Sequence, residues 1–103
     1  MNNKELISKY INNTRIALKT NTLKCVNNII YSYDEPICWF NRNTNTFYIT
    51  QMTFSQTTTR HCSLLKNILS NYNKKFKEIY RLSADFKDNP LFKECQSGTV
   101  QIG

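Results

Sequence analysis

A long apolar stripe in the second half of the chain constrains the fold most. After Met52 the hydrophobic period changes from two to about 3.6 residues, which is the period of an amphipathic helix. At about 100° per residue, the members of the stripe lie within about 80° of His61: Leu64, Leu65, Ile68, Leu69, Tyr72, Phe76, Ile79 and Leu82. The stripe predicts one helix that begins at Thr57 or Thr58 and continues to about Leu82. The phase is kept across Asn71–Asn73, so we expect at most a bend there.

The segment before the stripe is typical of β-strands. Residues 37–40 and 47–50 are rich in aromatic and β-branched side chains, and they flank 41–46, a loop of Asn, Arg and Thr. This pattern predicts a hairpin. Residues 23–33 predict one preceding strand, closed by the turn residues at 34–36. Together these segments predict a three-stranded antiparallel meander.

Strand alternation assigns the side chains of this meander to two faces. Ile37 and Trp39 are expected on one face, with Cys38 and Phe40 on the other. Both faces are partly apolar. The long helix covers one of them, and the other is either covered by an amino-terminal helix or exposed as an aromatic surface.

Two further helices complete the predicted fold. Residues 4–18 have apolar side chains at roughly helical spacing, with Asn2 or Asn3 available as the cap. Asn89-Pro90 is a helix-start signal for a short carboxy-terminal helix that extends through Cys95. A chain of 103 residues has material for one core, so we expect a single α+β domain over residues 1–103.

Net charge and cysteine spacing restrict the partners. Lys plus Arg number 14 against 7 acidic residues, giving +7 and a pI near 9.4, which favours polyanionic partners. No segment has the length or hydropathy of a signal peptide or membrane span, so we expect a soluble cytoplasmic protein and no membrane contact. The cysteines lack Cys-x-x-Cys pairs, and we expect reduced structural thiols with neither metal nor cofactor. Spacing does not exclude the alternative, a metal site built from Cys25, Cys38, Cys62 and His61.

The outer side of the predicted long helix is basic. The residues about 120° to 220° from His61 at helical spacing include Lys66, Ser70, Asn73, Lys74, Lys77 and Arg81. Such a ridge can follow the phosphates of a nucleic acid, although a solvated helix face has the same composition. Arg42 in the hairpin loop and Arg60 at the helix start are further candidates to contact an anionic partner. Tyr31, Tyr33, Trp39 and Tyr48 either stack on unpaired bases or belong to the core.

The stretch Phe54 to Cys62, FSQTTTRHC, combines hydroxyls, a cation, the single histidine and a thiol. Thr57 or Thr58 is placed to cap the helix. His61 lies near the middle of the apolar stripe, so a core histidine with hydrogen bonds is favoured over a catalytic or ligand role. One histidine, scattered carboxylates and the absence of a Gly-rich phosphate loop or a nucleophile elbow also argue against an enzyme.

Three short segments between Ser32 and His61 resemble a family of small proteins of unknown function, encoded largely by tailed phages and mobile elements. The family pattern is SYxxPI, then YIT, then YSxTTxxH. The matching segments here are Ser32–Ile37, Tyr48–Thr50 and Phe54–His61, with Phe54 where the family usually has Tyr. The resemblance covers about a third of the chain and implies no activity.

The resemblance implies a setting, that of a phage or mobile-element accessory protein. We expect a non-enzymatic binding protein whose partner is nucleic acid, contacted through the basic helix face. The alternative is an inhibitor of a host defence enzyme, anti-CRISPR-like, that binds an acidic or nucleic-acid-binding host protein stoichiometrically. The sequence gives no oligomeric state.

Overall fold

The centre of the molecule is a six-stranded sheet with strand order β1-β2-β3-β4-β5-β6. The computed structural model describes residues 1–52 and 55–101. The strands are β1 (Leu18–Lys19), β2 (Leu23–Val26), β3 (Ile29–Ser32), β4 (Glu35–Asn41), β5 (Thr46–Thr50) and β6 (Phe76–Ile79). The helices are α1 (Asn3–Asn12), α2 (Gln56–Asn71), α3 (Leu82–Asp85) and α4 (Pro90–Gln101). Neighbouring strands are antiparallel except for β6, which runs parallel to β5. The predicted α+β class is confirmed, and the predicted meander is the β3–β4–β5 part of a larger mixed sheet.

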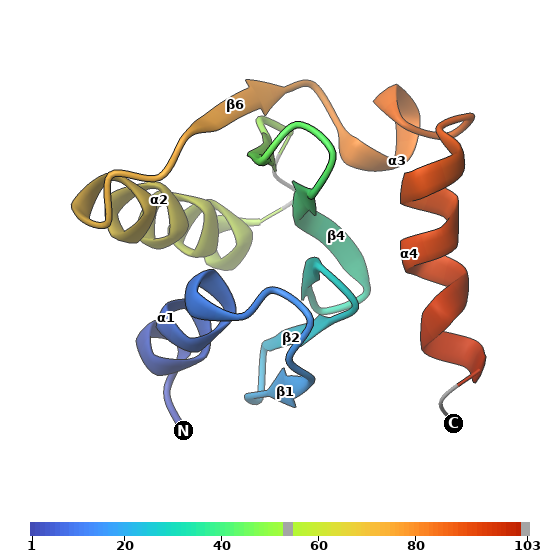
Figure 1. Cartoon of the computed structure of the whole chain (residues 1–103). Coiled ribbons are helices and arrows are strands. Elements are labelled where there is room, and N and C mark those ends of the chain that lie inside the picture. The colour runs from blue at the N-terminus through green and yellow to red at the C-terminus, as the bar shows by residue number, and fades with distance from the viewer. Residues whose placement is uncertain (53–54, 102–103) are drawn as a thin grey trace.

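Helices cover both faces of the sheet (Figure 1). The helices α1 and α2 lie on one face and α3 and α4 on the other. Two hydrophobic clusters follow from this arrangement. The first is built from α1, α2 and the sheet residues Leu23, Cys25, Ile30, Ile37, Cys38, Phe47 and Ile49. The second contains Ile29, Trp39, Leu82, Phe92 and Cys95. No helix within residues 1–52 and 55–101 has the length and hydropathy to cross a membrane.

A tight turn divides the predicted first strand in two. Asn27 and Asn28 have φ of 51° and 74°, and they connect β2 to β3. Two consecutive residues with positive φ are typical of a type I′ hairpin turn, for which asparagine is favoured. The single strand predicted over residues 23–33 is therefore wrong, because the two asparagines reverse the chain.

A β-bulge changes the face of one predicted core residue. Ile30 lies opposite Cys38 while Tyr31 lies opposite Pro36, which leaves Ile37 as the extra residue of β4. Ile37 is buried in the same cluster as Cys38, so its predicted position on the face of Trp39 is wrong. Cys38 and Phe40 do share a face, as alternation predicts.

The second sheet face is covered by the carboxy-terminal helices. Trp39 is fully buried there, with ring centroids 4.9 Å from Phe86 and 5.1 Å from Phe92. Tyr48 stacks on the same indole at 5.7 Å. Neither predicted alternative for this face is correct: α1 packs beside α2 on the first face, and among the described residues the aromatic side chains of the second face pack against α3 and α4.

The long helix predicted to Leu82 is wrong beyond Asn71, where α2 ends. Asn73 has φ of 55°, the Asn73 amide donates to Ser70 O at 3.0 Å, and the Lys74 amide donates to Leu69 O at 2.9 Å. These two bonds define a Schellman motif, with asparagine in the left-handed position that ends the helix. The chain then returns as β6 beside β5. Phe76 and Ile79 fit the stripe by spacing, yet they lie on opposite faces of a strand.

The terminal helices are confirmed with shifted boundaries. Asn2 is the α1 cap, accepting from the Glu5 amide at 2.8 Å, and α1 ends at Asn12 instead of continuing to Leu18. The backbone of Asn13 is extended, which stops the helix. Asn89 caps α4 by accepting from the Leu91 and Phe92 amides, as its position before a proline predicts.

Candidate functional site

The predicted basic ridge along one helix does not exist, because its members lie on different elements. Lys66 is on α2, Lys74 is in the turn after α2, and Lys77 is an exposed residue of β6. Arg81 precedes α3 as its cap residue. The Schellman turn at Asn73 separates these side chains, so the ridge is corrected to a set of unconnected cations.

Two of these cations form ion pairs that connect neighbouring elements. Lys66 Nζ lies 3.0 Å from a carboxylate oxygen of Glu78, linking α2 to β6. Arg81 donates from Nε and Nη2 to the two oxygens of Glu35 at 3.0 and 3.2 Å, linking the start of α3 to β4. A bidentate arginine–carboxylate pair of this kind fixes the orientation of both side chains in addition to pairing their charges. Both side chains are therefore engaged within the protein, which weakens their candidacy as phosphate ligands.

His61 is a buried histidine with hydrogen bonds on both ring nitrogens, as the apolar stripe predicts. It is 4 % exposed. Its Nδ1 lies 2.8 Å from Ser32 Oγ, and its Nε2 lies 3.1 Å from Thr22 Oγ1 and 3.4 Å from Asn3 Nδ2. Because Asn3 Nδ2 can only donate, His61 Nε2 is the acceptor and Nδ1 carries the proton given to Ser32. Burial lowers the pKa of His61, in agreement with this neutral form.

Two hydroxyls of FSQTTTRHC, those of Ser55 and Thr58, belong to the same network. Ser55, not Thr57 or Thr58, is the cap of α2, and its Oγ accepts from the Thr58 amide at 3.2 Å. Thr58 is 4 % exposed, and its Oγ1 lies 3.3 Å from Ser32 Oγ and 3.2 Å from Ser55 Oγ. The prediction of Thr57 or Thr58 as the cap is therefore wrong, because the cap is a serine two or three positions earlier. Thr58 instead connects the cap to the histidine network.

Ser32, Ser55, Thr58 and His61, four of the residues that carry the sequence resemblance, form one chain of hydrogen bonds. The chain joins α2 to β3, and the His61 contacts with Asn3 and Thr22 extend it to α1 and the β1–β2 turn. Ser32 is only 2 % exposed. A serine oxygen so buried is closed to solvent, and the network connects structural elements.

A basic groove lies where three chain segments meet. It has a volume of about 500 Å³. The segments are the α1–β1 connection, the β4–β5 hairpin and the turn between α2 and β6. We call the site the hairpin groove and define it by its lining residues: Ile11, Asn12, Asn13, Thr14, Arg15, Phe40, Asn45, Phe47, Asn73, Lys74 and Lys75.

The lining of the hairpin groove is positively charged. Arg15, Lys74 and Lys75 are exposed, and none of the lining residues carries a carboxylate. The carboxyl ends of α1 and α2 both approach the groove, and each helix end contributes roughly half a negative charge. Three full cations therefore leave roughly two positive charges facing the groove. This surface can attract an anion.

Of the predicted contact residues, Lys74 lines this groove, and Arg42 lies in the exposed hairpin turn that also contributes Asn45. Arg60 is exposed on the first turns of α2 and Lys77 on β6, and neither is among the lining residues. Sequence reasoning missed Arg15 and Lys75. The sequence does contain two Asn-rich turns that are each followed by a cation. That the two turns lie side by side follows only from the chain reversal after α2.

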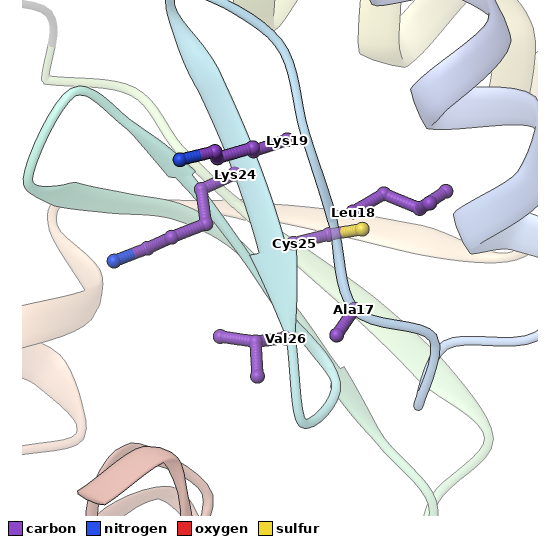
Figure 2. Close-up of a pocket in the computed structure, with 6 residues that line it drawn as sticks. All are labelled: Ala17, Leu18, Lys19, Lys24, Cys25 and Val26. Carbon is purple, nitrogen blue, oxygen red and sulfur yellow. The ribbon is translucent and has the colours of Figure 1, made fainter. Parts of the chain in front are cut away.

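Another, shallower hollow lies at the β1–β2 edge of the sheet (Figure 2). Figure 2 shows Lys19 and Lys24 pointing to one side of these strands, with Leu18 and Cys25 pointing to the other. The Lys24 ammonium lies 4.9 Å from the ring centroid of Tyr31, so one of the two cations already has an aromatic partner. No aromatic ring lines the hollow itself. The hairpin groove is more enclosed than this hollow.

The aromatic residues considered for base stacking occupy different environments. Trp39 is fully buried, and Tyr31 and Tyr48 pack partly buried against the second cluster. Tyr33 is 55 % exposed. The core interpretation therefore holds for the first three, and Tyr33 alone of the four has a largely open ring.

The four cysteines are buried free thiols. Burial raises the pKa of the Cys62 thiol to about 11 and also raises that of Cys38. In the described part of the chain no three His, Cys, Asp or Glu side chains gather as metal ligands would. Cys25, Cys38, Cys62 and His61 are therefore not brought together as a metal site.

Fold and site together describe a small α+β protein with a mixed sheet between two helical layers and a basic groove at one end. The chain belongs to the Family of unknown function (DUF8033), whose model matches residues 2–84. This range includes every strand, α1, α2 and all three segments of the hairpin groove, and it ends before α4. Comparison with curated proteins finds no match, and comparison with solved structures finds none either.

Proposed function

We propose that this protein is a non-enzymatic accessory binding protein of a phage or mobile element, and that it binds nucleic acid through the hairpin groove. The observation that carries the proposal is the convergence of Arg15, Lys74 and Lys75 on one groove that no carboxylate lines. Cations placed in this way can neutralise phosphates and release counterions. Arg42, in the hairpin turn beside the groove, extends the positive surface.

The charge distribution supports the groove over other surfaces. Of the cations predicted to bind, Lys66 and Arg81 are held by Glu78 and Glu35. The net charge of +7 adds long-range attraction for a polyanion, while the groove gives it a location. Arg60 and Lys77 remain predicted contacts outside the groove.

The test is the salt dependence of binding to a labelled oligonucleotide. Substituting Arg15, Lys74 and Lys75 with Gln removes three charges, so the slope of log K against log salt is expected to fall by roughly 2 to 3. A matched control substitutes three exposed lysines outside the groove, Lys4, Lys87 and Lys93, with Gln, giving both variants the same net charge. The control is expected to keep most of the slope. Equal losses in both variants would show that net charge, not the groove, causes binding.

A stoichiometric inhibitor of a host defence enzyme is the second candidate. It is favoured by two exposed tyrosines, Tyr33 and Tyr80, which are 55 % and 59 % exposed and follow β3 and β6 at the sheet end away from the hairpin loop. Exposed tyrosine is enriched at protein interfaces. Tight binding to a host protein that survives the groove substitutions and is lost in a Tyr33→Ser, Tyr80→Ser variant would favour this function.

A further inference from the structure

An accessible aromatic ring forms part of the hairpin groove. Phe40 is half-buried, and its ring centroid lies 4.7 Å from that of Phe47, which is 3 % exposed. Phe47 in turn meets Tyr10 edge to face at 5.9 Å. Phe40 is therefore supported from behind by buried rings, while part of its own surface stays open to the groove.

Two amide side chains in the groove have no partner in the described part of the chain. Asn45 and Asn73 both have positive φ, 54° and 55°, and both are exposed at the turns that border the groove. The hydrogen bond from Asn73 to Ser70 O uses the backbone amide of Asn73 and leaves its side chain out. An asparagine amide offers one acceptor and two donors, which suits the mixed edge of a nucleobase.

We propose that the hairpin groove binds single-stranded nucleic acid, with an unpaired base stacked on Phe40 and the adjacent phosphates on Arg15, Lys74 and Lys75. This inference rests on the proposed function and specifies its ligand. Asn45 and Asn73 are the side chains placed to meet the edge of the base.

The shape of the site favours a single strand over a duplex. Proteins that read duplex DNA insert a convex helix or β-ribbon into the major groove. The hairpin groove is concave, and its volume of about 500 Å³ is in the range of sites for small ligands. A paired base inside a duplex cannot present its face to Phe40, whereas an unpaired base can stack on it.

Fluorescence anisotropy with a labelled oligo(dT) and with a hairpin duplex of similar phosphate number, at one fixed salt concentration, tests the ligand class. Binding of the single strand is expected to be about 5 to 150 times tighter, since one base stacked on an aromatic ring contributes a factor in that range. Phe40→Leu keeps an apolar side chain against Phe47 but removes the stacking face. It is expected to weaken oligo(dT) binding by a factor in the same range and to leave the salt slope unchanged.

Phe40→Trp supplies a second readout that does not depend on a destabilised variant. The variant is expected to keep its affinity for oligo(dT), and the fluorescence of the introduced indole is expected to be quenched on binding. The only native tryptophan, Trp39, is buried, so its emission should stay constant. Equal affinity for duplex and single strand, with no effect of Phe40→Leu and no quenching, overturns the inference. If the substitutions of Arg15, Lys74 and Lys75 still reduce the salt slope when that outcome is found, nucleic-acid binding through the groove stands and only the single-strand inference is lost. Absence of binding to either ligand overturns both.

Discussion

Substitution of His61 tests whether the FSQTTTRHC stretch is a structural junction. His61→Asn can keep a donor toward Ser32 while losing the contacts of Nε2 with Thr22 and Asn3. His61→Gln can keep the Nε2 side while losing Ser32. Each loss removes buried hydrogen bonds, for which about 1 to 2 kcal/mol is expected. His61→Ala loses both sides and leaves a cavity, so about 3 to 4 kcal/mol is expected.

The pH dependence of stability gives an independent signature of the same residue. The imidazole titrates near 6.5 in the unfolded chain, and burial lowers the pKa of His61 in the folded protein. As pH falls below about 6.5, the unfolded state binds the proton before the folded state does. The folded protein therefore loses stability between pH 6.5 and the lower pKa of His61 in the folded state. The loss can reach about 1.4 kcal/mol per pH unit. The chain has one histidine. In the pH range above the titration of the carboxylates and below that of the amino terminus, the slope therefore comes from His61 alone.

The assay is urea unfolding followed by circular dichroism at pH 7.5, 6.5 and 5.5, for the native protein and the three variants. The native protein is expected to lose stability from pH 6.5 to 5.5, and each variant should be nearly flat over that interval. A His61→Ala protein as stable as the native one, or an unchanged pH slope in His61→Asn, would refute the reasoning. The first result would mean that the network contributes nothing to folding, and the second that the pH slope does not arise from His61.

The remaining predictions concern α4, the end of α2 and the thiols. Phe92→Ala is expected to cost about 3 to 5 kcal/mol in urea unfolding, because Phe92 is 1 % exposed against Trp39; Lys93→Ala, on the exposed side of α4, should cost less than about 0.5 kcal/mol. Asn73→Gly should be neutral or stabilising and Asn73→Ala should cost about 1 kcal/mol, since only the latter adds strain at positive φ; equal stabilities would contradict the Schellman assignment. With a pKa of about 11, Cys62 is about one part in a thousand thiolate at pH 8, so a disulfide reagent should modify it at a rate limited by unfolding, and rapid modification of the folded protein would contradict its burial.

Local patterns in the sequence identified most elements but not all boundaries. The hairpin of β4 and β5, the capped start of α4 and the burial of His61 follow from turn residues, a capping signal and helical spacing. The pair Asn27-Asn28 was also a turn signal, but the β-branched residues on both sides concealed it within an apparent single strand. The bulge at Ile37 had no local signal, because it arises from the register between β3 and β4.

The functional surface was the least predictable part. Spacing placed Lys66, Lys74, Lys77 and Arg81 on one helix face, and a single left-handed residue, Asn73, removed that face. Lys74 survived as a candidate because it lies in the turn itself. Arg15 is far from it in sequence, and only the packing of the α1–β1 connection against the α2–β6 turn brings the two into one groove.

By itself the sequence determined the α+β class, the excess of positive charge and the burial of the single histidine, since composition and local periodicity decide these properties. The tertiary structure decided where α2 stops, that β6 joins the sheet in parallel with β5, and which cations share a groove. The physical reason is that an apolar residue every third or fourth position fits a helix continued through Asn73 as well as a helix followed by a strand. Only the burial gained when Phe76 and Ile79 reach opposite faces of the sheet selects the second.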